Sequence, residues 1–313
     1  MTAADPERRA LLTTRAALAG LATALFLLGL KSYAALTTGS VAMLGSLADT
    51  ALDVIASLVT LFGVRVAAIP ADRDHRFGHG KAESLAALVQ VGIITVSALG
   101  IGWRAIARLV DGEQTDHAQY GIAVSLVAIA ATLALIAYQR SVIRRTGSVA
   151  IGADRLHYQS DLLLNLAVIA ALALDQYAGL TGADPAFGIA IAAWLMFGAW
   201  RASTRAVDQL MDKEWPEERR RAFVAVAARH PQGRGIHDLR TRSSGTREFA
   251  QFHMWVDPTM TIASAHEVMD EIEADLAREF PGVEVLIHLD PEGQVDQPGN
   301  VLAEADETEG LPS

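Results

Sequence analysis

The stretch that decides the fold is S-L-A-D-T-A-L-D, residues 46–53, which places Asp49 and Asp53 inside an apolar segment. Four residues apart on a helix, the two carboxylates lie on one face, one above the other. Residues 41–61 have the composition of a membrane-spanning helix, and a charge at the bilayer centre costs about 3 kcal/mol or more. Because this segment contains no Lys or Arg, the two acids need a cation from elsewhere.

The composition divides the 313-residue chain into two parts. Residues 11 to about 210 are mostly apolar, whereas residues 211–313 have a soluble composition, and the net charge of −10 is weighted toward them. An acidic chain lacks the basic face that binds phosphates, so nucleic acid is not expected as a partner. The chain has no Cys, which excludes disulfides and thiolate metal sites and leaves Asp, Glu, His, backbone oxygen or water as metal ligands.

Six apolar segments are each long enough to span a lipid bilayer. Their approximate ranges are 12–36, 39–68, 82–110, 117–140, 148–175 and 183–207. Lys and Arg are absent from alternate linkers and gather in the others, for example as Arg140, Arg144 and Arg145. The positive-inside rule therefore predicts that both termini are cytoplasmic. The polar start lacks a signal-peptidase site, so a cytoplasmic leader is favoured over a cleaved signal peptide.

The pattern after the sixth segment predicts a small α+β domain with helices on one face of a sheet. The expected elements are a helix at 216–230, a hairpin of strands at 236–243 and 247–256, a helix at 261–280 and a strand at 283–290. The predicted organisation is thus a leader (1–11), an all-α six-helix transmembrane domain (12–210), a cytoplasmic α-β-β-α-β domain (211–291) and a disordered acidic tail (292–313).

The fifth apolar segment supplies a partner for the two acids. L-H-Y-Q-S-D, residues 156–161, places His157 and Asp161 four residues apart, again on one helical face. Two helices could therefore bring together Asp49, Asp53, His157 and Asp161. Four nitrogen and oxygen ligands suit tetrahedral Zn²⁺, and the imidazole favours Zn²⁺ over ions that prefer all-oxygen cages. The alternative is that each polar side chain is satisfied separately within a helical bundle.

Three other residues of the apolar segments have simpler expected roles. Ser57 and Asn165 are expected to form ordinary hydrogen bonds between helices. Leu156 precedes His157 directly. It is either a hydrophobic gate beside the predicted site or a packing leucine.

Two further clusters contain residue types that bind metals. In D-R-D-H-R-F-G-H-G-K, residues 72–81, the spacing of Asp72, His75 and His79 would allow them to close around one ion, although a solvated loop of mixed charge is the alternative. The soluble domain has four histidines and an aspartate in its expected strands and second helix. These residues are His237, His253, His266, His288 and Asp290. They predict a second metal site, although the sequence does not show that they converge.

Several motifs together resemble the cation diffusion facilitator family, close to its bacterial zinc and ferrous-iron efflux pumps. They are D-x-x-x-D in the second segment, F-G-H-G-K-A-E after it, H-x-x-x-D in the fifth segment and H-D-L-R-T-R-x-S-G in the soluble domain. The resemblance covers the chain from the first segment to Pro291. It implies a multi-pass homodimer in the bacterial inner membrane with metallochaperone-like cytoplasmic domains, which exports Zn²⁺, and also Cd²⁺, in exchange for protons.

The resemblance also assigns the clusters to sites. It implies a transport site of Asp49, Asp53, His157 and Asp161, a loop site of Asp72, His75 and His79, and a binuclear structural zinc site of His237, His253, His266, His288 and Asp290 that stabilises the dimer. It further implies a salt bridge between Lys81 and Asp212. Leu289 departs from the family pattern, because close relatives have a polar residue at this position.

Other functions fit the sequence less well. A membrane-tethered zinc sensor would leave the intramembrane ligands without a role. An enzyme is not expected, because the chain lacks H-E-x-x-H and G-x-S-x-G and because H-E-V-M-D at 266–270 has no second His. Among transporters, an exporter of Fe²⁺, Co²⁺ or Mn²⁺ remains the alternative. Whichever metal is exported, protons should neutralise the empty transport site and leave it when the metal enters, because metal ligands must be deprotonated.

Overall fold

The computed structural model describes residues 6–38, 41–111, 122–178, 183–232, 234–245 and 247–292. It divides into two units. The first comprises Glu7–Pro70 and His79–Val207, and the second combines Pro6 and Ala71–Gly78 with the described residues from Asp208 to Glu292. The predicted tail, from residue 293 on, and the first five residues of the predicted leader lie outside the described residues.

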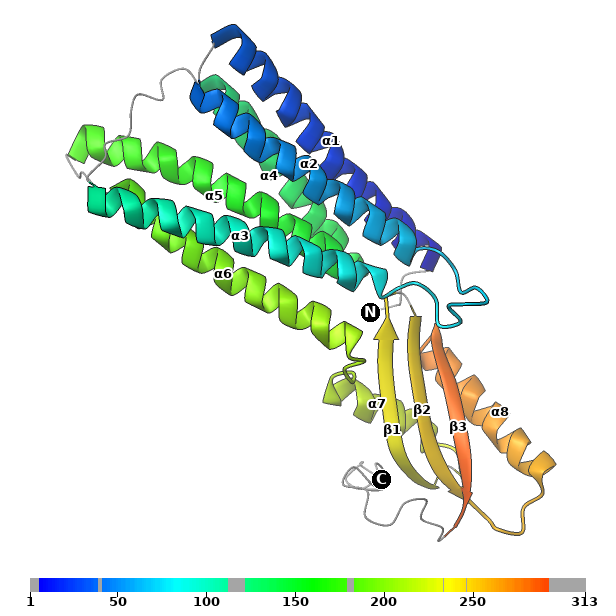
Figure 1. The fold of residues 1–313 in the computed structure, drawn as a ribbon. Coiled ribbons are helices and arrows are strands. Elements are labelled where there is room, and N and C mark those ends of the chain that lie inside the picture. Colours follow the sequence, from blue (N-terminus) through cyan, green and yellow to red (C-terminus); the bar gives the residue numbers. More distant parts are fainter. Residues whose placement is uncertain are drawn as a thin grey trace. The chain divides into compact units, whose positions relative to one another are not determined.

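The regular secondary structure in the described residues of the first unit is all helical, as predicted (Figure 1). Its helices are α1 (Pro6–Thr38), α2 (Val41–Ala67), α3 (Ala82–Asp111), α4 (Ile122–Thr146), α5 (Val149–Ala178) and α6 (Ala183–Leu210). Among the described residues, α1, α2, α3, α4 and α6 each contain a stretch long and apolar enough to cross a membrane. Helix α5, which carries His157 and Asp161, is not in this set.

Helix α4 is longer than the sequence pattern predicts. It continues to Thr146 instead of ending near residue 140, so Arg144 and Arg145 occupy its last turn and Arg140 is also helical. Arg has a high helix propensity, and its charge interacts favourably with the negative end of the helix dipole. These basic residues therefore extend the helix beyond its apolar part.

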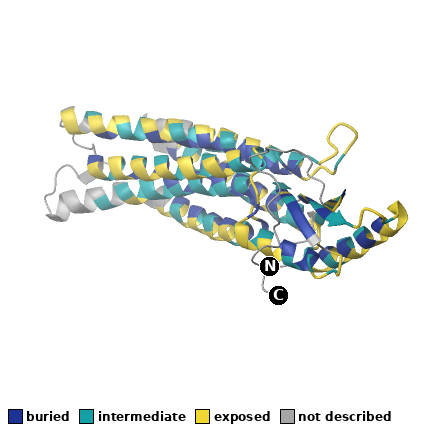
Figure 2. Cartoon of the chain, turned by 90° about the horizontal axis from the view of Figure 1, so that it is seen from below, coloured by how far each residue is buried: buried dark blue, intermediate teal, exposed yellow. Residues whose placement is uncertain are grey.

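Helix α5 lies at the centre of the first unit, where it packs against α2, α3 and α4. Small residues allow the helices to approach closely, as they do in many membrane bundles. At the crossing of α2 and α3, a Cβ atom added to Gly63 would lie only 2.3 Å from the Cβ of Ala86. Large apolar side chains such as Phe62, Trp103 and Trp200 are exposed, and Figure 2 shows exposed residues along the helices. Such exposed apolar surface is expected where helices face lipid.

The second unit confirms the predicted α-β-β-α-β order. Its elements are α7 (Glu217–Ala227), β1 (Arg234–Ser244), β2 (Arg247–Val256), α8 (Ile262–Glu279) and β3 (Val283–Pro291). Strands β1 and β2 form the predicted antiparallel hairpin, and α8 connects β2 to the parallel strand β3. The start of α8 is capped by Thr261, whose side chain accepts a hydrogen bond from the Ser264 backbone N–H.

The core of the second unit lies between its helices and its sheet. Phe223 of α7 is fully buried and contacts the rings of Trp215, Phe252 and Phe280 in edge-to-face arrangements. Leu289 of β3 is partly buried and packs against this core. The departure from the family pattern at Leu289 therefore adds apolar contact to the domain.

Candidate functional site

The structure brings together three of the four residues of the predicted intramembrane site. His157 Nε2 on α5 lies 2.9 Å from Asp53 Oδ1 on α2. One ligand atom from each of Asp53, His157 and Asp161 lies within 4.8 Å of the other two. Asp49 belongs to α2, but its side chain lies outside the described residues. Asp53 of α2 thus faces His157 and Asp161 of α5 across one helix contact, and we call these three residues the membrane cage.

The surroundings of the membrane cage leave one coordinating atom without a partner. His157 is buried, and no described residue forms a hydrogen bond with its Nδ1. Buried polar atoms are nearly always satisfied, so an orphaned imidazole nitrogen needs an explanation. The nitrogen that faces Asp53 is Nε2, so Nε2 is the atom placed to bind an ion together with Asp53. The donor set of one imidazole and two carboxylates fits a divalent transition metal.

The hydrogen bonds predicted between helices for Ser57 and Asn165 have different outcomes. Ser57 Oγ on α2 lies 2.9 Å from the hydroxyl oxygen of Tyr158 on α5, so its predicted interhelical hydrogen bond is confirmed. Asn165 Nδ2 instead donates to the backbone carbonyl of Asp161, 2.7 Å away on its own helix. The prediction for Asn165 was therefore wrong. Its side-chain amide donates a hydrogen bond to a backbone carbonyl one turn earlier in the same helix.

A lysine from a third helix contributes charge near the membrane cage. Lys31 of α1 donates a 2.7 Å hydrogen bond from Nζ to Thr50 Oγ1, and its charge acts on Asp161. Thr50 directly follows Asp49 in the sequence. The sequence pattern did not identify this residue, because Lys31 lies on a different helix from either acidic pair.

Leu156 packs between α5 and α6. A Cβ atom added to Gly198 of α6 would lie 2.8 Å from Leu156 Cδ1, and Leu156 also borders the cluster that contains Val91 and Leu195. The contacts are those of a packing leucine. A gating role for Leu156 stays a prediction.

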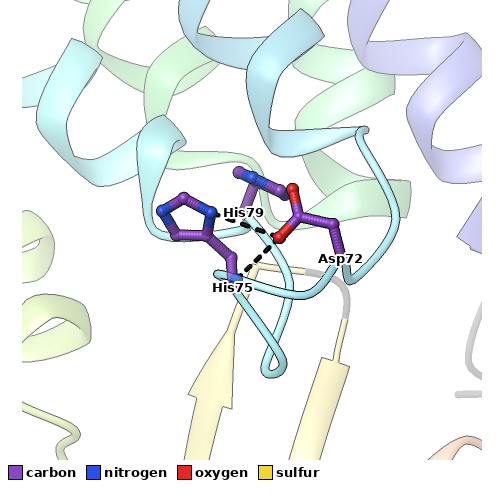
Figure 3. Close-up of side chains that lie close together, drawn as sticks. All are labelled: Asp72, His75 and His79. Carbon is purple, nitrogen blue, oxygen red and sulfur yellow. Dashed lines mark hydrogen bonds and ion pairs between the residues drawn. The ribbon is translucent and has the colours of Figure 1, made fainter.

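The predicted loop site is compact and local (Figure 3). Asp72 Oδ1 accepts hydrogen bonds from the backbone N–H groups of Asp74 and His75, at 3.0 and 2.7 Å. His75 Nδ1 lies 3.4 Å from the same oxygen. Ligand atoms of Asp72, His75 and His79 all lie within 4.8 Å of one another, and the first two residues are exposed. The geometry allows one ion to be bound, in a site open to water.

The loop that carries Asp72 and His75 is attached to the sheet by an aromatic contact. The guanidinium carbon of Arg242 lies 4.1 Å from the ring centroid of Phe77 and 4.7 Å from that of Phe249. Phe77 and Phe249 also meet edge to face. Arg242 further approaches Asp212, at 3.9 Å. The predicted pairing of Asp212 with Lys81 stays a prediction.

The three strands of the second unit bring together a second triad, His237, His253 and Asp290. His237 faces His253 across the β1–β2 pair, and Asp290 Oδ2 lies 3.5 Å from His237 Nε2 and 2.8 Å from His253 Nδ1. His237 Nδ1 lies 2.7 Å from the Gly235 carbonyl oxygen. A hydrogen bond there fixes the tautomer and leaves Nε2 with a lone pair for a metal ion. We call this group the sheet triad.

Irregular backbone geometry in β1 determines the direction of the side chains near the sheet triad. The register shifts on both sides of His237, and such bulges commonly redirect side chains next to functional sites. Gly235 has φ of +56°, and an added Cβ there would lie 2.1 Å from the Trp255 ring. Asp238 has φ of +48°, and its Oδ2 lies 3.9 Å from His253 Nε2. Asp238 is therefore a carboxylate near this site that the sequence pattern missed.

The remaining two predicted residues of the soluble-domain site lie apart from each other. His288 Nε2 is 3.3 Å from Asp290 Oδ1, and its ring lies 4.6 Å from that of His253, so His288 borders the sheet triad. His266 on α8 is exposed and lies 3.9 Å from Asp270, one turn along the same helix. Within the described residues of one chain, four of the five predicted ligands are thus neighbours and His266 is separate.

Comparison with known proteins assigns both units to domain families. Residues 17–211 match the family model described as the cation efflux transmembrane domain, and residues 215–292 match the model of the cation efflux protein cytoplasmic domain. The cation-efflux pump FieF of Pectobacterium atrosepticum is 43% identical over 286 residues, which cover 91% of this chain and 95% of the relative. FieF of Serratia proteamaculans is 44% identical over 280 residues, 90% and 93% of the two chains.

Solved structures also match part of the chain. The zinc form of the zinc transporter CzrB has 36% sequence identity and a TM-score of 0.26, and the match covers 28% of this chain and 99% of that structure. The two family models together span nearly all described residues of both units. The chain is therefore a multi-pass cation-efflux protein of the cation diffusion facilitator family.

Proposed function

We propose that this efflux protein exports Zn²⁺, and also Cd²⁺, from the cytoplasm in exchange for protons. The observation that carries the proposal is the convergence of Asp53, His157 and Asp161 between α2 and α5. An imidazole with carboxylates is a donor set typical of Zn²⁺. An exporter of Fe²⁺, Co²⁺ or Mn²⁺ with the same mechanism is the alternative, and the curated FieF relatives do not decide between the metals.

Proton exchange follows from the charges of the membrane cage. Without metal, its carboxylates repel one another in a poorly hydrated site, which favours proton uptake. His157 Nε2 is 2.9 Å from Asp53 Oδ1 and can share a proton with it. An entering Zn²⁺ requires deprotonated ligands and so expels these protons. Movement of the helices around the occupied site would expose it to each side of the membrane in turn.

The sheet triad fits a resident structural zinc ion. Its buried His237 already has one ring nitrogen engaged by a backbone carbonyl, which leaves the other nitrogen directed at Asp290. We infer that zinc bound here, with His288 nearby, stabilises a homodimer, and that His266 completes the binuclear site only in the dimer. The loop site of Asp72, His75 and His79 would receive cytoplasmic metal. We further infer, from the distribution of Lys and Arg among the linkers, that both termini lie in the cytoplasm and that the protein belongs to the bacterial inner membrane.

The proposal is tested by ion flux in proteoliposomes that contain the purified protein. With an imposed pH gradient, Zn²⁺ and Cd²⁺ uptake should exceed Fe²⁺, Co²⁺ and Mn²⁺ uptake, and a lumenal pH dye should report proton movement in the opposite direction. Protein-free liposomes control for leakage. If Fe²⁺ or Mn²⁺ is taken up faster than Zn²⁺, that ion and not zinc is the substrate. Flux that is independent of the pH gradient would exclude proton exchange.

Replacing Asp290 should remove zinc from the sheet triad. Asp290→Asn keeps the shape of the side chain but loses the charge that faces three histidines, so zinc affinity at this site should fall at least about 100-fold. Metal content after gel filtration measures the effect. Asp257→Asn is the matched control, because Asp257 is exposed and its side chain binds Thr259. An unchanged zinc content in Asp290→Asn would show that the triad does not hold the ion.

A further inference from the structure

A buried carboxylate outside the membrane cage has no role in the proposed metal site. Asp154 on α5 is 0% exposed. It precedes His157 by three residues and Asp161 by seven, so all three lie on one face of the helix. No described Lys, Arg or His side chain forms an ion pair with it. A buried charge without a cation is costly, so Asp154 needs a separate explanation.

Neutral hydrogen-bond donors from three other helices surround Asp154. Gln139 Nε2 on α4 donates to Oδ2 at 2.7 Å, and Gln90 Nε2 on α3 donates to Oδ1 at 3.2 Å. Thr60 Oγ1 on α2 also donates to Oδ1, at 3.4 Å. From α1, Gly20 approaches so closely that an added Cβ would lie 3.0 Å from Oδ2. Burial in this pocket disfavours the charged form of Asp154, while the neutral donors hydrogen-bond to the carboxylate without neutralising it.

The same pocket also contains acceptors that suit a protonated carboxyl group. Gln90 Oε1 and Gln139 Oε1 are both buried and have no hydrogen-bond partner among the described residues. A half-turn of either amide would place its oxygen where its nitrogen now lies. A protonated Asp154 could then donate its O–H to that oxygen. The surroundings can thus satisfy Asp154 in both protonation states, whereas a purely structural carboxylate needs only donors.

The charges that act on Asp154 come from the membrane cage. Its titratable neighbours are His157 and Tyr158 on its own helix and Asp53 on α2, while α1, α3 and α4 present the neutral groups of Gly20, Gln90 and Gln139. The carboxylate of Asp53 disfavours a further negative charge at Asp154, whereas a protonated His157 favours it. A divalent cation bound in the cage adds two positive charges and so makes the field of the cage carboxylates less negative. The occupancy of the cage should therefore control the charge of Asp154.

We propose that Asp154 is a proton-binding residue of the exchanger, which takes up a proton when the membrane cage empties and releases it when the cage binds metal. On uptake, the carboxylate forms an O–H bond with a proton from water. On metal binding this bond breaks, the electron pair stays on the carboxylate and the proton returns to water. The inference rests on the proposed proton exchange, and it adds a proton site that does not bind metal.

The test counts the protons released when Zn²⁺ binds to the full-length protein in detergent, in weak buffer with a pH indicator. Asp154→Asn should bind zinc but release roughly one proton fewer per ion than the wild type, and Asp154→Glu should restore the release. Tyr158→Phe is the matched control, since it removes a buried hydroxyl one turn away on the same helix and leaves the acid in place. Equal proton release by Asp154→Asn and the wild type would overturn the assignment.

The outcomes separate this inference from the function on which it rests. No zinc-linked proton release from the wild type would exclude proton exchange itself, whereas full release from Asp154→Asn excludes only the role of Asp154. If Asp154→Asn does not assemble, zinc-induced infrared difference spectra of the wild type and Asp154→Glu replace it. The proposal is supported if zinc binding removes a carboxylic-acid band from the wild-type spectrum and this band lies at a different frequency in Asp154→Glu. A band at the same frequency in both proteins overturns it.

Discussion

Asp161→Asn and Asp53→Asn should each lower Zn²⁺ flux at least about 100-fold. Loss of outer-shell groups alone typically reduces metal affinity or activity by about 10- to 100-fold, and these residues are proposed to be direct ligands. The amide keeps the volume of the carboxyl group but loses its charge, so the cost of dehydrating Zn²⁺ is no longer offset. In Asp53→Asn, His157 also loses the carboxylate that lies 2.9 Å from its Nε2.

The measurement is initial Zn²⁺ uptake into proteoliposomes at matched protein density. Asp208→Asn provides the same chemical change away from the cage, because Asp208 forms a hydrogen-bonded ion pair with the exposed Lys213. This control should transport at the wild-type rate. Normal uptake by either cage variant would mean that zinc crosses the membrane without this carboxylate, and the proposed transport site would then be wrong.

His157→Asp should shift the transported ions toward harder cations. The substitution converts the membrane cage to oxygen ligands, which suit Mn²⁺ and related ions better than an imidazole does. We expect the preference for Zn²⁺ over Mn²⁺ to fall by about tenfold or more, because a ligand type is exchanged at the centre of the site. Competition between labelled Zn²⁺ and unlabelled Cd²⁺, Fe²⁺ or Mn²⁺ in the flux assay measures this preference.

The control for His157→Asp must also add negative charge. Asn165→Asp does so on the same helix, one turn from Asp161, without removing the imidazole. It should keep the wild-type order of ions, although its rate can differ. A His157→Asp variant that retains the Zn²⁺ and Cd²⁺ preference would show that the imidazole does not select the metal.

The sequence predicted the architecture because periodicity reports it directly. Apolar segments of membrane-spanning length mark the helices of the first unit, and the switch from helical to alternating patterns marks the hairpin of β1 and β2. Two i, i+4 pairs in apolar helices are also visible without a structure, because the cost of burying each charge demands a partner. That Asp53, His157 and Asp161 lie close together could therefore be anticipated.

The features that were missed depend on contacts between elements far apart in the sequence. Asp154 is the same residue type as the proposed ligand Asp161, and only its partners Gln90 and Gln139 on other helices distinguish its surroundings. Asp238 reaches the sheet triad through a positive φ that no pattern predicts for Asp. The side chain of Asn165 donates to a backbone carbonyl of its own helix instead of to an acceptor on a neighbouring helix, and the sequence does not show which of such competing acceptors is used.

The parallel pairing of β3 with β2 has a consequence for biosynthesis. The chain must pass through the whole of α8 before His288 and Asp290 can reach His253. During translation, the proposed intramembrane ligands are complete as soon as Asp161 has been made, whereas the sheet triad stays incomplete until β3 leaves the ribosome. A nascent chain therefore contains the proposed transport ligands well before it can bind the proposed structural ion. Zinc retention by the second unit would thus mark the emergence of β3.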